Sequence, residues 1–144
     1  RVEDFVAAMG LAATGVSVVT TDGPAGRFGL TVSAVSSVSA DPPLVLVCIN
    51  RKSPAMAGVE GNGVFAVNLL SSAHRAYAET FSGRPREGSP FDFSNHDWRD
   101  GETGLPLVAQ ATAVFECEMH DRLDAGTHRI FIGRVVAAAR HCVQ

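Results

Sequence analysis

Residues 29–53 place the tightest constraint on the fold, because they hold two strand patterns separated by a pair of prolines. From residue 30 to residue 39, apolar side chains alternate loosely with hydroxyl-bearing ones, as in a strand with one apolar face. Residues 44–49 are apolar throughout, which is typical of a strand covered on both faces. Pro42 and Pro43 separate the two patterns, since proline cannot donate to a strand ladder. The stretch therefore predicts two strands joined by a turn.

The rest of the chain carries more strand patterns than helix patterns. Further strands are expected at residues 15–20, 64–70, 109–121 and 127–139. Helices are expected at residues 2–9, 54–59 and 71–81, from helical spacing of apolar residues or from a capping residue before a proline. Residues 83–104 are rich in Gly, Pro, Asp, Ser and Asn, and are expected to form a long loop. Many strands with few helices predict a mainly β protein, an antiparallel β-barrel in a single domain.

Residues 109–121 give the clearest strand pattern of the chain. Apolar and polar side chains alternate there, so we expect one face of the strand in the core and the other in solvent. Glu116 and Glu118 fall two residues apart on the polar face. They could form an acidic pair, but a solvated strand face is the favoured interpretation.

Charge and hydropathy exclude several classes of partner. The chain carries 12 Lys and Arg residues against 15 Asp and Glu, a net charge of −3, and its longest basic cluster is Arg51-Lys52. This balance argues against a nucleic-acid or anionic-membrane surface. No apolar stretch approaches the roughly 20 residues of a membrane span, and no signal-peptide pattern opens the chain. We therefore expect no nucleic-acid partner, no membrane and a cytoplasmic location.

The cysteines indicate neither a disulfide framework nor a metal site. Cys48, Cys117 and Cys142 are odd in number and form no C-x-x-C motif. Cys48 and Cys117 fall inside strand patterns, where a free thiol behaves as a small buried hydrophobe. Cys48 also lies two residues before Asn50, so contact with a ligand at the end of the strand is the alternative to a plain core role.

Polar side chains follow the buried strand at residues 44–49 directly. Asn50, Arg51 and Ser53 come next, and Ser53 precedes Pro54, a combination typical of a helix start. The free N–H groups and the dipole of such a helix favour an anion, so this segment could hold a phosphate. A helix capped by Ser53 alone, with a solvated Arg51, explains the same residues, and the pattern leaves both interpretations open.

Several short motifs along the chain resemble a known family. They are residues 19–23, 29–39, 42–50, 53, 65–70, 81–83, 126–128 and 132–135. No single motif is specific, but their order and spacing resemble the short-chain flavin reductases, the reductase components of two-component flavin monooxygenases. The resemblance begins at Met9 and runs nearly to the end of the chain. It implies the FMN-binding split barrel, a Greek-key antiparallel barrel that assembles as a homodimer.

The resemblance also implies an activity. The expected enzyme is an NAD(P)H-dependent flavin reductase, with FMN or FAD as the flavin and NADH or NADPH as the co-substrate. It would pass reduced flavin by diffusion to a separate oxygenase component. A flavin-dependent corrinoid reductase of cobalamin synthesis and a non-catalytic FMN-binding module are the alternatives. Family members continue past the position of Gln144, so the resemblance implies one flavin reductase-like domain, residues 1–144, that lacks its C-terminal strand.

The resemblance assigns roles to particular residues. The expected flavin-binding residues are Thr31, Val32, Ser33, Ala34, Ser37, Cys48, Asn50, Arg51, Ser53, Phe81 and Gly83. Backbone groups of residues 31–34 would meet the polar edge of the flavin ring. Asn50, Arg51 and Ser53 would lie near the ribityl chain and the phosphate. Phe81 and Gly83 would border the flavin, although core packing explains Phe81 equally well.

His128 is the expected catalytic residue. It lies in Gly126-Thr127-His128, which resembles the glycine-x-histidine motif of the family, and would position the nicotinamide. A satisfied polar residue in a strand is the alternative for this histidine. Arg84 and Arg86 could hold the phosphates of the dinucleotide, but a solvated loop is the favoured interpretation for both.

Overall fold

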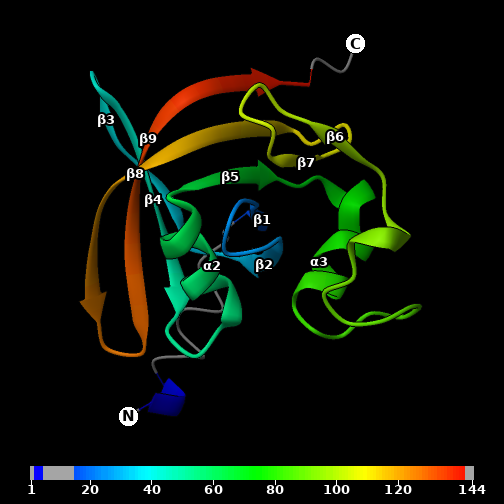
Figure 1. The fold of residues 1–144 in the computed structure, drawn as a ribbon. Coiled ribbons are helices and arrows are strands. Elements are labelled where there is room, and N and C mark those ends of the chain that lie inside the picture. The colour runs from blue at the N-terminus through cyan, green and yellow to red at the C-terminus, as the bar shows by residue number, and fades with distance from the viewer. Residues whose placement is uncertain (1, 5–14, 142–144) are drawn as a thin grey trace.

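The protein is built around one antiparallel sheet that curls into a barrel (Figure 1). The computed structural model describes residues 2–4 and 15–141. The strand order is β2-β1-β5-β8-β9-β4-β3. The strands are β1 (Ser17–Thr21), β2 (Phe28–Val32), β3 (Val35–Ala40), β4 (Pro43–Asn50), β5 (Val64–Leu69), β8 (Ala113–Ala125) and β9 (His128–Arg140). Strands β2 and β4 contact one another although they lie far apart in this order, so the predicted mainly β, antiparallel barrel is confirmed.

The segment predicted as one strand over residues 30–39 forms two strands. The chain bends at Ser33 and Ala34, which separate β2 from β3. Strand β2 pairs with β1, whereas β3 pairs with β4 at the other end of the strand order. One straight strand could not join both ladders, so the chain turns between them. A bulge between Ser37 and Ser39 explains why the alternation in β3 is loose.

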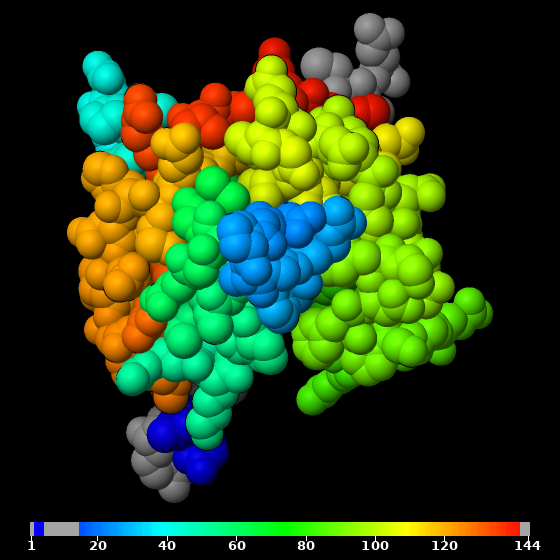
Figure 2. Space-filling view, viewed as in Figure 1, coloured from blue at the N-terminus to red at the C-terminus, as the bar shows by residue number. Residues whose placement is uncertain are grey.

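Two helices, α2 (Pro54–Asn62) and α3 (Arg75–Phe81), flank the β1–β2 hairpin. Figure 2 shows this hairpin, in blue, at the surface between them. Helix α2 begins as predicted, because Ser53 Oγ accepts a hydrogen bond from the N–H of Ala55 at 3.2 Å. It continues past the predicted end to Asn62, and Gly63 follows with a φ of 70°, which suits a residue without a Cβ.

The other helix predictions are met in part. The predicted helix at residues 71–81 is a 3₁₀ turn, η1 (Ser72–His74), followed by α3. The predicted helix at residues 2–9 lies mostly outside the described residues, and residues 2–4 are helical. Among the helices of the described part of the chain, none has the length and apolar character needed to span a membrane.

The predicted loop at residues 83–104 contains regular structure. It holds a 3₁₀ turn, η2 (Phe93–Asn95), and β6 (Trp98–Asp100), which pairs with β7 (Pro106–Val108). Strands of three residues are too short to show a period in the sequence. Leu107 and Val108 of β7 are buried in a second apolar cluster with Ala66 of β5 and Val114 of β8. The sheet is therefore covered on a second face, outside the barrel core formed by residues such as Val47 and Phe131.

This covering explains why the expectation for Glu116 is wrong. Glu116 is only 3% exposed, because the loop before β7 packs over it. Its carboxylate accepts hydrogen bonds from the backbone N–H of Glu102 at 3.2 Å and from the N–H and hydroxyl of Thr103 at 3.0 and 2.5 Å. A bulge between Glu116 and Cys117 shifts the alternation, and Glu118 is exposed as predicted. Glu116 thus fastens a loop to the sheet.

Replacing Glu116 with alanine should lower the free energy of unfolding by about 2–3 kcal/mol, because three donors lose their shared acceptor. Urea unfolding at one protein concentration, followed by the fluorescence of Trp98, measures this change. The matched control is Glu118→Ala, which should change the free energy by less than about 0.5 kcal/mol. Equal losses in the two variants would contradict the anchoring role of Glu116.

Candidate functional site

Segments that the sequence singled out separately meet at the C-terminal end of β4. The backbone N–H of Cys48 donates to the carbonyl of Ala34 at 3.2 Å, which joins the bend after β2 to this strand. On the opposite edge, β9 pairs with β4 so that Asn50 lies across from His128. The strand therefore places the expected ring-edge segment, the expected phosphate segment and the expected nicotinamide residue beside one another.

A pocket of about 540 Å³ opens between the start of α2 and the turn that joins β8 to β9. We call it the basic pocket; its lining residues are Asn50, Arg51, Lys52, Met56, Gly126, Thr127 and Arg129. The backbone N–H of Arg51 donates to the carbonyl of Thr127 at 3.0 Å, which ties the two walls together. Three cationic side chains near a helix N-terminus suit an anion such as a phosphate.

An ion-pair network surrounds Arg129. Its guanidinium donates to both carboxylate oxygens of Asp124, at 2.5 and 3.2 Å, and also to Glu60 of α2. These carboxylates raise the pKa of Arg129, and the hydrogen bonds from Arg129 lower the pKa of Asp124. Arg51 lies 3.7 Å from Asp124, and Arg122 lies 3.5 Å from Glu60. The network therefore fixes the β8–β9 hairpin against α2.

The expected phosphate residues differ in what they do. Asn50 and Arg51 line the basic pocket, whereas the hydroxyl of Ser53 caps α2. Sequence reasoning missed Lys52 and Arg129, which line the same pocket. Lys52 lies between the candidates Arg51 and Ser53, and this position was the signal that could have identified it as a pocket residue. Arg129 reaches the pocket through the β4–β9 ladder, which no local pattern reveals.

The expected ring-edge residues lie at the bend between β2 and β3. Ser33 and Ala34 are exposed there, and Ser37 is exposed on β3. The side chain of Val32 is buried in the barrel core, so its backbone is what could meet a ligand. The hydroxyl of Thr31 donates to the carbonyl of Ala78 at 2.8 Å and thereby ties β2 to α3.

Phe81 is fully buried in the structure. Its ring packs against those of Phe93 and Trp98, with centroids 4.8 and 5.6 Å away. A Cβ on Gly29 would come within 2.8 Å of the Phe81 ring, so this glycine lets β2 approach α3 closely. Gly83 follows at the end of the helix with a φ of 84°. Phe81 thus packs in the core beside β2, as the core-packing interpretation expects.

Cys48 and His128 are both half-buried at the end of the ladder. Burial raises the pKa of the Cys48 thiol. The Nδ1 atom of His128 lies 2.8 Å from the hydroxyl of Thr127, which orients the imidazole ring. Side chains of Asn50 and His128 fall on one face of the sheet, because they are paired across the ladder.

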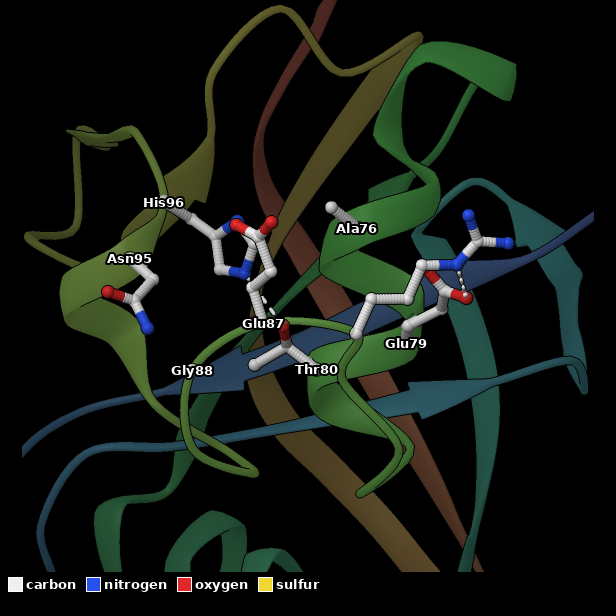
Figure 3. Close-up of a pocket in the computed structure, with 8 residues that line it drawn as sticks. Ala76, Glu79, Thr80, Glu87, Gly88, Asn95 and His96 are labelled. Carbon is white, nitrogen blue, oxygen red and sulfur yellow. Dashed lines mark hydrogen bonds and ion pairs between the residues drawn. The ribbon is translucent and has the colours of Figure 1, made fainter.

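A second pocket, also of about 540 Å³, lies between α3 and residues 86–96 (Figure 3). His96 Nε2 lies 2.7 Å from the hydroxyl of Thr80, and its ring stacks on Tyr77 at 4.5 Å. Burial lowers the pKa of His96. The guanidinium of Arg86 lies 3.3 Å from the carboxylate of Glu79, so this arginine already has an anionic partner. The residues expected to bind flavin or to position the nicotinamide lie outside the lining of this pocket.

Comparison with known proteins identifies the family. The model of the flavin reductase like domain matches residues 9–142. The FMN reductase (NADH) RutF 2 of Methylorubrum extorquens is 44% identical over 132 residues, which span 92% of this chain and 76% of that protein. The FMN reductase (NADH) RutF of Bradyrhizobium diazoefficiens is 42% identical over 140 residues, 96% of this chain and 76% of that protein.

Solved structures agree with the sequence relatives. BorF, the flavin reductase component of a bacterial two-component tryptophan halogenase, has a TM-score of 0.87 at 34% identity, over 100% of this chain and 90% of that one. The flavin reductase PheA2 has a TM-score of 0.86 at 33% identity, over 96% of this chain and 86% of that one. The fold and the resemblance inferred from the motifs are therefore confirmed, and the chain belongs to the flavin reductase family.

Proposed function

We propose that the chain is an NADH-dependent FMN reductase whose reduced flavin diffuses to a separate oxygenase component. The observation that carries the proposal is the meeting of Ala34, Asn50 and His128 at the end of β4, beside the basic pocket. The relatives named FMN reductase (NADH) support the choice of FMN and NADH. The likeness to the flavin reductases of a tryptophan halogenase and of styrene monooxygenase supports a separate oxygenase. We place the reaction in the cytoplasm, where NADH is available.

We propose one orientation of FMN on these residues. Arg51 and Lys52 of the basic pocket would hold the phosphate, and Arg129 would brace the wall of the pocket. The exposed backbone at Ser33 and Ala34 would meet the polar edge of the ring. His128 would orient the nicotinamide from β9, which pairs along the edge of β4 opposite to Ala34. When bound, the flavin itself supplies the hydride chemistry, so the chain needs to bind, orient and exclude water rather than to move protons.

The proposed assembly is a homodimer. Leu123 and Ile130 pair across β8 and β9, on the face opposite the barrel core. Leu46 and Ile132 form the next row on this face. Leu123 is 48% exposed and the other three are half-buried. Cys48 lies at the edge of this band, beside the bend at Ala34. An apolar band of this kind on a sheet favours cover by another protein surface, here a second copy of the chain.

The first test follows the loss of NADH and NADPH absorbance with purified protein, with and without added FMN or FAD. We expect NADH oxidation that depends on free FMN. Tight FMN binding without oxidation of either nicotinamide would contradict the reductase and leave a flavin-binding module. If NADH is oxidised only after a corrinoid is also added as acceptor, the result would support the corrinoid reductase instead.

Replacing His128 with alanine should raise the KM for NADH about three- to tenfold, the loss of roughly one hydrogen bond. The Kd for FMN should stay near the wild-type value, because His128 lies outside the lining of the basic pocket. His120→Ala, at an exposed position of β8, is the matched control. An unchanged KM for NADH in His128→Ala would remove the proposed role of this residue.

Saturation with FMN should slow the alkylation of Cys48 by iodoacetamide at about pH 8. The reaction without FMN should be slow and should accelerate as the pH rises, because burial raises the pKa of this thiol. Cys117 is the internal control, since burial and the charge of Glu116 raise its pKa to about 12 and it has no exposed surface. Peptide mapping by mass spectrometry separates the cysteines. Equal alkylation rates of Cys48 with and without FMN would place the flavin elsewhere.

A further inference from the structure

Asp124 contacts two of the three cations that line the basic pocket. It stands near the C-terminal end of β8, directly across the ladder from Arg129. Arg129 donates to it through Nε at 2.5 Å and through Nη2 at 3.2 Å. Arg51 Nη2 lies 3.7 Å from the same carboxylate. The side chain of Asp124 is 42% exposed, so its charge faces the solvent from which an anionic ligand would arrive.

The two arginines depend on Asp124 to different degrees. Arg129 also donates to Glu60 of α2, and so retains a carboxylate partner if the charge of Asp124 is removed. Arg51 is 49% exposed, and its other side-chain bond, of 3.3 Å, goes to the neutral carbonyl of Gly126. The charge of Asp124 therefore matters most for Arg51.

We propose that Asp124 competes with the flavin phosphate for Arg51 and so keeps FMN binding weak enough for reduced flavin to leave. The inference rests on the proposed function, in which the basic pocket holds the phosphate. Carboxylates and phosphates accept the same guanidinium N–H groups. An exposed pair at 3.7 Å separates easily. An incoming phosphate would take Arg51, and Asp124 would stay with Arg129.

The test removes the charge of Asp124 and keeps an oxygen that Arg129 can bond. In Asp124→Asn, the Kd for FMN should fall about two- to fivefold at low salt. The Kd for riboflavin, which has the same ring but no phosphate, should not change. Titrations that follow the quenching of flavin fluorescence measure both constants. The gain for FMN should shrink at about 1 M salt, where the screening length is about 3 Å.

Two further variants separate a local effect from a general change of charge. Asp121→Asn makes the same change on the same exposed stretch of β8, where the carboxylate accepts from the backbone N–H of Arg122, and should leave both constants unchanged. Adding Asp124→Asn to Arg51→Gln should leave the Kd for FMN at the value of Arg51→Gln alone, because Asp124 acts through Arg51. A Kd that falls two- to fivefold below that of Arg51→Gln would overturn this route.

The outcomes for the two proposals differ. If wild-type protein binds FMN more tightly than riboflavin but Asp124→Asn does not improve FMN binding, the role of Asp124 is overturned and the reductase proposal stands. If wild-type protein binds both flavins equally, the basic pocket is not a phosphate site and the inference falls. Tighter FMN binding by Asp124→Asn in a protein that does not oxidise NADH would support the competition for Arg51 but would contradict both the reductase proposal and a role in the release of reduced flavin.

Discussion

The pairing of β4 along both of its edges is the constraint on which the candidate site depends. Val45, Val47 and Ile49 of this strand are buried in the barrel, and their alternation fixes the register against β3 and β9. A shift of β4 by one residue would move these side chains out of the core, so their burial fixes the register of the strand. The position of Asn50 relative to His128 is therefore set by packing several residues away.

The cations of the basic pocket differ in how closely they are paired with carboxylates. Arg129 is enclosed by two carboxylates and acts mainly as a brace between the β8–β9 hairpin and α2. Arg51 and Lys52 are exposed and less constrained. A pocket with one braced cation and two adaptable ones keeps its shape and still adjusts to an anion. This division would suit the exchange of FMN that we propose.

The sequence predicted the barrel well because several strands carry clear periods, and its motifs singled out Asn50, Arg51 and His128 separately. Their proximity follows from the pairing of β4 with β9. It failed where the cause lies outside the segment. The bend at residues 33–34 exists because β2 and β3 join different partners. Glu116 is buried because a distant loop supplies its hydrogen bonds. Arg129 joins the pocket because β9 pairs with β4, and the residues next to Arg129 in the sequence do not reveal this pairing.

The alternation along β9 has a consequence for how FMN and NADH would share one strand in the proposed site. His128 lies across from Asn50, while the next residue, Arg129, lies across from the buried Ile49 and turns toward α2. Consecutive residues thus serve opposite sides of the same ribbon. In the proposed function, the two ligands would meet without a domain movement, because their contacts come from adjacent residues of β9. An insertion of a single residue between His128 and Arg129 would turn His128 to the other side, while the packing of Phe131 against Val47 would keep Arg129 in place.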